Sequence, residues 1–124
     1  VHPFTSTGLA FEFRDGKAVS VETGGDQQAL AKAWAAETGD KDVLGEVIIG
    51  CNPLLTEVPG SSFLPHYGFG AGVVRLILGD NILSGGSFRS TFHRWLTWND
   101  ASLEVEGRML IEQGRQIPLE ELRP

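Results

Sequence analysis

The sequence predicts an α+β fold: a mixed or antiparallel, barrel-like β-sheet domain with one main helix at about residues 26–38. Two segments alternate apolar and polar residues around an acidic residue followed by glycine, which is typical of β-hairpins. Short apolar runs bounded by Gly, Asn and Pro indicate further strands, and a single segment has helical spacing. A chain of 124 residues, 41% of them hydrophobic, fits one cooperative core. We therefore expect a single domain over residues 1–124.

The two predicted hairpins share one plan. The first turns at Asp15-Gly16 and the second at Glu106-Gly107, and glycine favours the positive backbone angles that tight turns need. The apolar positions are Leu9, Phe11, Phe13, Val19 and Val21 in the first hairpin, and Leu103, Val105, Met109 and Ile111 in the second. We expect these side chains to face the core.

The predicted helix follows the first hairpin. Asp26 is a good N-cap residue, and Leu30, Ala33 and Trp34 fall at the spacing of one helical face. Gly39 ends the pattern, because glycine is common just beyond a helix. This is the only segment for which we predict a helix.

Three further strands are predicted, over residues 43–50, 71–79 and 90–98, the first two of them buried. Residues 54–70 form a long irregular connection between two of them. The single cysteine, Cys51, cannot form an internal disulfide and follows an apolar run, so we expect a buried structural thiol. Arg75 is the one charged residue within the second strand.

Charge and hydropathy exclude several classes of partner. A net charge of −6 and a pI near 4.9 oppose binding to nucleic-acid phosphates or anionic lipids. The chain has no apolar run approaching the roughly 20 residues that cross a bilayer, and its first residues do not form a secretion signal. We therefore expect a cytoplasmic protein with no nucleic-acid partner and no membrane partner.

Several short motifs occur in a fixed order along the chain. They are Gly45-Glu46 with Gly50-Cys51-Asn52-Pro53, the strand from Val74 to Asn81, Gly85-Gly86, and Ser90 to His93. In this order they resemble the C-terminal part of aminopeptidase T and the related 2,5-dihydroxypyridine 5,6-dioxygenases, over roughly residues 8–115. In that metalloenzyme family the corresponding strands bring metal-binding carboxylates and imidazoles together. The resemblance implies a truncated relative, because the family's larger N-terminal part supplies a further carboxylate ligand.

The resemblance implies four relict metal-site positions. Glu46 matches the family's carboxylate and His93 its last histidine, whereas Arg75 stands where the family has a histidine and Trp95 where it has an aspartate. Arginine stays protonated and cannot serve as a metal ligand. Residues two apart on a strand share a face, so Trp95 is expected to place an apolar ring beside His93. We therefore expect no bound metal, no cofactor and no catalytic residue.

The retained residues allow several interpretations. Glu46 and Arg75 are expected either to form a buried ion pair in place of the metal or to face solvent on opposite faces. His93 is a structural histidine, a relict ligand or a general base, of which the structural role is favoured. A substitute metal site formed by Glu46, His66 and His93 is a further alternative.

The function implied is that of a non-catalytic accessory protein, a pseudoenzyme that binds a peptide, such as the precursor peptide of a biosynthetic pathway. An edge strand can add a peptide strand while aromatic side chains read its residues; the candidates are Phe63, Tyr67, Phe69 and Trp98. The alternative is a small metal-dependent hydrolase or dioxygenase whose site is completed across a dimer. A homodimer is expected on either account, because loss of the family's N-terminal part uncovers apolar surface.

Overall fold

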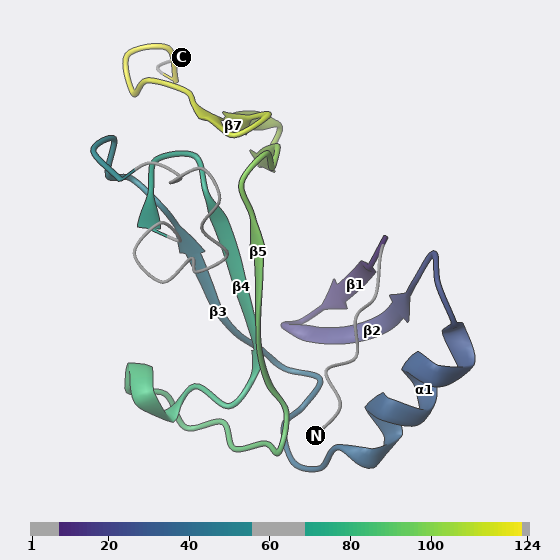
Figure 1. The fold of residues 1–124 in the computed structure, drawn as a ribbon. Helices are drawn as coiled ribbons and strands as arrows, with labels where there is room; N and C mark the ends of the chain where they lie inside the picture. Colours follow the sequence, from purple (N-terminus) through teal and green to yellow (C-terminus); the bar gives the residue numbers. More distant parts are fainter. Residues whose placement is uncertain (1–7, 56–68, 123–124) are drawn as a thin grey trace. The chain divides into compact units, whose positions relative to one another are not determined.

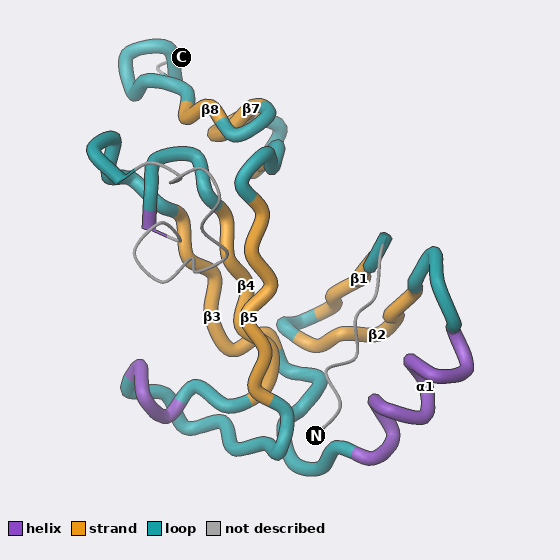
Figure 2. Tube along the Cα trace, viewed as in Figure 1, coloured by secondary structure: helices purple, strands orange, loops and turns teal. Residues whose placement is uncertain are grey.

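A computed structural model describes residues 8–55 and 69–122. Within these residues it has one α-helix and three small antiparallel sheets, with the strand orders β1-β2, β3-β4-β5 and β6-β7-β8 (Figures 1 and 2). The elements are β1 (Ala10–Arg14), β2 (Lys17–Glu22), α1 (Gln27–Ala36), β3 (Leu44–Ile49), β4 (Val74–Gly79), the 3-10 helix η2 (Ile82–Ser84), β5 (His93–Trp98), β6 (Leu103–Val105), β7 (Arg108–Glu112) and β8 (Arg115–Gln116). The predicted α+β class is confirmed, and its sheets are antiparallel.

The chain forms two compact units. The first comprises residues 1–46 and 77–94, and the second comprises residues 47–76 and 95–124. The first unit contains the β1-β2 hairpin, α1 and η2, and the second contains the β6-β7-β8 sheet. Strands β3, β4 and β5 each have residues in both units.

Both predicted hairpins are present. In the first, Phe11 lies opposite Val21, and a bulge between Glu12 and Phe13 shifts the register. The turn residues Asp15 and Gly16 both have positive φ, at 50° and 76°, as a two-residue hairpin turn of this kind requires. Alternation along the chain and the glycine at the turn are therefore sufficient to define this element.

The second hairpin continues into a strand that the sequence did not predict. Glu106 and Gly107 repeat the positive-φ turn between β6 and β7, with φ of 51° and 76°. Gln113 and Gly114 form a third such turn, which leads into β8. Since β8 has only two residues, it is too short to show an alternating pattern.

Helix α1 begins and ends close to the predicted residues. The Asp26 side chain accepts a hydrogen bond from the Ala29 backbone N–H at 2.9 Å, which caps the first turn. Leu30 is buried, and the Trp34 ring packs edge-on against Phe92 with ring centroids 5.0 Å apart. Ala33 is exposed, so the buried face is narrower than predicted. Within the described part of the chain, no helix is long and apolar enough to cross a membrane.

Strand β4 is buried, as predicted. The apolar side chains of residues 73, 74, 77 and 78 are each less than one-tenth exposed. The strand begins at Val74 rather than at residue 71, because Gly72 has a φ of 87° and leaves the extended conformation. This strand carries Arg75 into the protein interior.

Two predictions of burial are wrong. Strand β3 was expected to be buried, but its residues Val47 and Ile49 are exposed, so its outer half alternates as a half-buried strand does. Cys51 was expected to be a buried thiol and is exposed instead. It lies just beyond the end of β3, and its Sγ is within 3.5 Å of the Ile49 carbonyl oxygen. An apolar run alone therefore does not define which of its residues are covered.

Candidate binding surface

Arg75 is buried against two aromatic rings of the second unit. Arg75 is only 2% exposed. The guanidinium carbon lies 4.1 Å from the centroid of the Trp95 ring and 5.1 Å from that of Phe69. Both distances are within the range of a cation–π interaction, to which the planar guanidinium is well suited. The positive charge thus packs on the π faces of two side chains.

The two rings that cover Arg75 reach solvent themselves. Trp95 is 53% exposed and Phe69 is 47% exposed. We call Phe69 and Trp95 the aromatic surface. Large aromatic side chains bury much apolar area for little loss of conformational entropy, which is why they are common in binding sites. The buried cation and the strand beneath it give this surface a fixed support.

Close backbone packing positions Phe69. A Cβ atom on Gly50 would lie only 2.0 Å from the Gly70 carbonyl oxygen, so only glycine permits the two backbone segments to approach this closely. Asn52 donates its backbone N–H to the Phe69 carbonyl oxygen at 3.3 Å, within an isolated parallel bridge between Asn52 and Gly70. Gly50 and Asn52 belong to the Gly-Cys-Asn-Pro motif, which therefore has a structural role next to the aromatic surface.

The structure brings together two of the four relict metal-site positions, Arg75 and Trp95. These are the two positions for which the resemblance implies that a metal ligand has been replaced. The Trp95 ring contacts the guanidinium of Arg75, and its expected place beside His93 stays a prediction. The sequence did not reveal this contact, because the register between neighbouring strands cannot be read from either strand alone.

His93 lies in the first unit and is half-buried. Its Nδ1 is 3.0 Å from the Asp80 carbonyl oxygen. A carbonyl oxygen only accepts hydrogen bonds, so Nδ1 is the donor in this contact. Such a bond orients a structural histidine and also orients metal-binding histidines, so it fits both interpretations of His93.

Glu46 also lies in the first unit and is half-buried. Among residues 8–55 and 69–122, no three side chains of the His, Cys, Asp and Glu types form a group that could hold a metal ion. His66 lies outside the described residues, as does the alternative site that includes it. The ion pair between Glu46 and Arg75 would join residues of different units, and it stays a prediction.

The four residues expected to bind peptide have different outcomes. Phe63 and Tyr67 lie outside the described residues. Phe69 is exposed as a binding residue must be, and Trp98 is half-buried in β5. Trp95 was not among the residues expected to bind peptide, and its ring is exposed as well.

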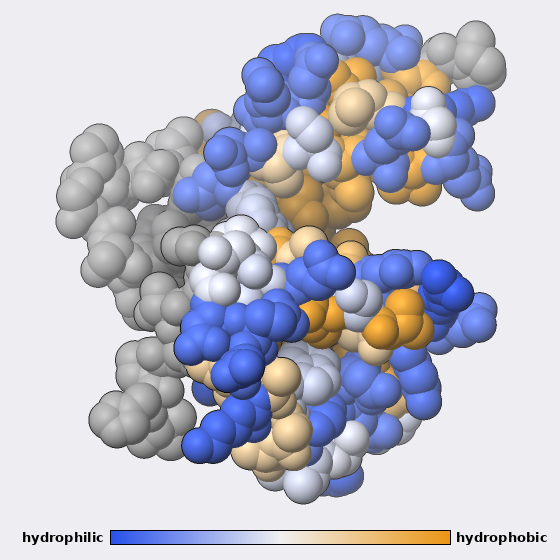
Figure 3. All heavy atoms as spheres, turned by 90° about the vertical axis from the view of Figure 1, so that its right-hand side faces the viewer, coloured by the Kyte–Doolittle hydropathy of each residue, from blue (hydrophilic) through white to orange (hydrophobic). Residues whose placement is uncertain are grey.

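The second unit carries most of the exposed apolar surface among the described residues. Among the large apolar side chains that are exposed in the described residues, only Val19 and Leu83 belong to the first unit. The others are Val47, Ile49, Leu54, Phe69, Trp95, Val105, Met109 and Leu119. Figure 3 shows such apolar residues, in orange, reaching the surface between hydrophilic ones. Such side chains favour an interaction surface where they adjoin one another, as Phe69 and Trp95 do at Arg75.

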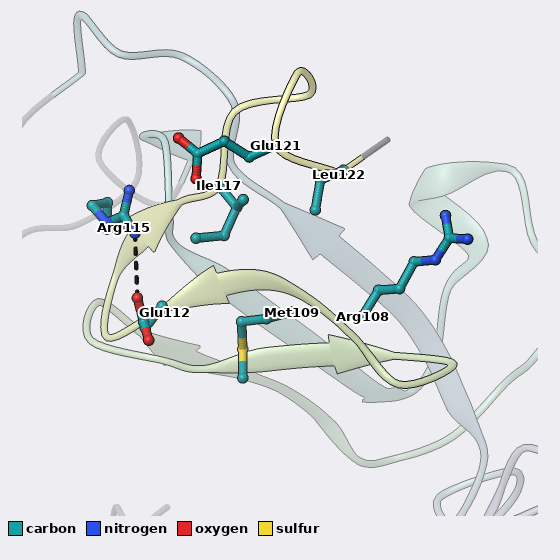
Figure 4. A pocket seen from close by; sticks show the side chains of 7 residues that line it. All are labelled: Arg108, Met109, Glu112, Arg115, Ile117, Glu121 and Leu122. Atoms are coloured by element: carbon teal, nitrogen blue, oxygen red, sulfur yellow. Dashed lines mark hydrogen bonds and ion pairs between the residues drawn. The ribbon is translucent and has the colours of Figure 1, made fainter. Parts of the chain in front are cut away.

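The second unit also contains a pocket of about 460 Å³ beside β7 and β8 (Figure 4). Its lining residues are Arg108, Met109, Glu112, Arg115, Ile117, Glu121 and Leu122. Arg115 donates a hydrogen bond to the Glu112 carboxylate at 3.2 Å, so these two charges neutralise each other on the rim. The lining is mixed, because Met109, Ile117 and Leu122 are apolar and the other four residues are charged.

Comparison with known proteins gives no relative: no protein-family model, curated protein or solved structure matches the chain. What the chain does must therefore be inferred from its own features, of which the contact between Arg75 and the exposed Trp95 ring is the most specific.

Proposed function

We propose that this protein is a non-catalytic relative of aminopeptidase T-like metalloenzymes and that it binds a peptide through the aromatic surface. The observation that carries the proposal is the buried guanidinium of Arg75, which lies 4.1 Å from the ring centroid of Trp95. In the family resemblance these two residues replace a metal-binding histidine and aspartate. A protein cation and an aromatic ring thus occupy positions that otherwise hold ligands of a metal cation.

Electrostatics support the loss of metal chemistry. Arginine stays protonated, so Arg75 offers a divalent ion no neutral donor in place of the histidine of the resembled family. A catalytic ion also needs about three protein ligands and an open position. The resemblance leaves only Glu46 and His93 as ligands. Both arguments favour a protein without a resident metal and without hydrolase or dioxygenase activity.

The exposed features of the second unit support a peptide as the partner. Phe69 and Trp95 offer ring area, and the pocket beside β7 and β8 offers space for a side chain of the peptide. The small β6-β7-β8 sheet has edge strands, to which an extended peptide can add main-chain hydrogen bonds. The resembled family includes aminopeptidases, which act on peptide chains. We propose a cytoplasmic role, such as holding the precursor peptide of a biosynthetic pathway.

Peptide selection tests this proposal. A random-peptide library is selected on the wild-type protein, and the enriched peptides are measured against Trp95→Ala, Phe69→Ala and the matched control Leu83→Ala. Leu83 is 93% exposed and belongs to the first unit, so its removal changes exposed apolar area elsewhere. We expect the two aromatic substitutions to weaken binding by about tenfold or more and the control to leave it unchanged.

Equal binding by all four proteins would overturn the aromatic surface as the binding site. Cleavage or oxidation of a substrate by the dimer after metal loading would instead support the alternative of an enzyme. The two results are distinguishable, because the first is measured without metal and the second requires it.

A further inference from the structure

We propose that the first unit contains a second binding site, which holds a small amphiphile with an anionic head and a short aliphatic chain, such as a medium-chain carboxylate. The site is a pocket of about 450 Å³ between β2 and α1 (Figure 1). All the residues that line it belong to the first unit. It is therefore separate from the aromatic surface, and it does not depend on the proposed binding of a peptide.

One wall of this pocket is a single face of α1. Its lining residues recur at the helical spacing of three or four: Gln27, Leu30, Ala31, Trp34 and Ala35. Ala31 and Ala35 are exposed, and because their side chains are single methyl groups, they leave space that larger residues would fill. Leu30 is buried and Trp34 is half-buried, so most of this wall is apolar. An aliphatic chain gains free energy when it leaves water for such a wall.

The opposite wall is the stretch of β2 from Ala18 to Val21. Hydrogen bonds tie both ends of this stretch to neighbouring segments. Gln27 Nε2 donates to the Val21 carbonyl oxygen at 3.0 Å, and Ala18 donates its backbone N–H to the Asp42 carbonyl oxygen at 2.7 Å. The stretch spans about 10 Å, at about 3.3 Å per residue. It is too short and too enclosed for an added peptide strand, whereas an extended chain of about eight carbons, with bonds of about 1.5 Å, has the matching length.

Lys41 determines the charge of the ligand. Of the described residues that line the pocket, only Lys41 is charged. Its ammonium donates hydrogen bonds to the carbonyl oxygens of Trp34 at 2.6 Å and Glu37 at 2.8 Å, and it has no further hydrogen bond or ion pair within the described part of the chain. An ammonium has three N–H groups, so one is left for a ligand.

The two partners of Lys41 do not neutralise it. They are uncharged carbonyl groups at the end of α1, whose dipole offsets about half of an elementary charge. A carboxylate head would add a charge-assisted hydrogen bond from the third N–H group. A cationic head would be repelled at the same place. The apolar walls and Lys41 together therefore select an anionic amphiphile.

Three probes with the same aliphatic chain test the head group directly: octanoate, octanol and octylamine. Each is titrated into the ¹⁵N-labelled protein while the tryptophan indole N–H resonances are followed, with Trp34→Phe and Trp95→Phe used to assign them. We expect octanoate to shift the Trp34 resonance and to bind at least about fivefold more tightly than octanol. Octylamine should bind more weakly than either.

Two alanines of α1 supply a matched pair of variants. Both Ala31 and Ala33 are exposed, but only Ala31 lines the pocket. Because a leucine at residue 31 would fill the space for the chain, we expect Ala31→Leu to weaken octanoate binding at least about tenfold and Ala33→Leu to leave it unchanged. Lys41→Met removes the charge and keeps an unbranched side chain. This variant should bind octanoate no more tightly than octanol.

Several results would overturn the proposal. Octanol or octylamine binding to the wild-type protein as tightly as octanoate would exclude selection of an anionic head. A shift at Trp95 without one at Trp34 would place the amphiphile on the aromatic surface instead. Absence of any shift at Trp34, or equal binding by Ala31→Leu and Ala33→Leu, would exclude the pocket between β2 and α1. The wild-type comparison and the alanine pair are decisive even if Lys41→Met does not fold.

Discussion

The guanidinium carbon of Arg75 lies 4.1 Å from the ring centroid of Trp95. Each residue alone would be costly at its position, since one is a buried charge and the other is an aromatic ring that is 53% exposed. Together they form a cation–π pair, and a tryptophan is the strongest common partner for a cation. The two residues are thus coupled in the folded protein, and several predictions depend on this coupling.

Substitutions at Trp95 should lower the unfolding free energy less when the new side chain keeps an aromatic ring than when it does not. Trp95→Phe keeps a ring beneath which Arg75 can pack, whereas Trp95→Leu keeps only apolar area. We expect the leucine variant to lose about 1 kcal/mol more unfolding free energy than the phenylalanine variant, in line with a partly desolvated cation–π pair. Urea unfolding followed by circular dichroism measures the difference. If the two variants were equally stable, Trp95 would act by area alone and not through its π face.

Two glycine substitutions separate backbone strain from steric overlap in the second unit. Gly72 and Gly107 both have positive φ, at 87° and 76°. A Cβ on Gly72 would lie 1.8 Å from the Gly114 carbonyl oxygen, whereas a Cβ on Gly107 would meet nothing within 4 Å. We expect Gly107→Ala to cost about 1–2 kcal/mol, which is the cost of the left-handed conformation. Gly72→Ala should lower the unfolding free energy clearly more in the same assay. Equal losses for the two variants would contradict the close packing of Gly72 against the turn at Gly114, which precedes β8.

Replacing Arg75 and Trp95 by the family's ligands should create metal binding. The structure places these two side chains in contact, so Arg75→His and Trp95→Asp would introduce an imidazole and a carboxylate near each other. We expect the double variant to bind zinc more tightly than wild type, with each single variant weaker than the double, as isothermal titration calorimetry would show. No gain in the double variant would mean that the motifs have been aligned to the wrong strands.

The fold was predictable from the sequence where the signal is local. The hairpins are defined by alternation and by Asp15-Gly16 and Glu106-Gly107, and α1 by the Asp26 cap. Contacts between strands were not predictable in the same way. The pairing of Arg75 with Trp95 depends on cross-strand register, which no local pattern contains.

Burial was predicted less well than secondary structure. The apolar run before Cys51 suggested a covered strand end, but whether a strand is covered on one face or both depends on elements distant in sequence. The exposed side chains of Val47 and Ile49 show this directly. The candidate site was therefore only partly predictable: its residues were identified from motifs, and its chemistry became apparent from contacts.

The apolar side chains exposed on the second unit should be covered by a second copy of the chain. A two-fold dimer places the same surface of both copies against itself, and Val47 is one of the exposed apolar side chains of the second unit. Light scattering at micromolar concentration should give about twice the 13.4 kDa mass of one chain. Val47→Lys should shift the mass toward that of the monomer, whereas Leu83→Lys on the first unit should not. A monomeric wild-type protein would contradict this assembly and leave the apolar patch for the peptide.

The metal content of the wild-type protein tests the proposed loss of metal chemistry most directly. The purified protein is dialysed against equal concentrations of zinc, ferrous iron and manganese, and bound metal is then measured by elemental analysis after removal of free ions. Because Arg75 is a buried cation packed on Trp95, we predict far less than one ion of any of the three metals per chain. One tightly held ion per chain or per dimer would contradict a non-catalytic protein and would favour an enzyme whose site is completed by other residues.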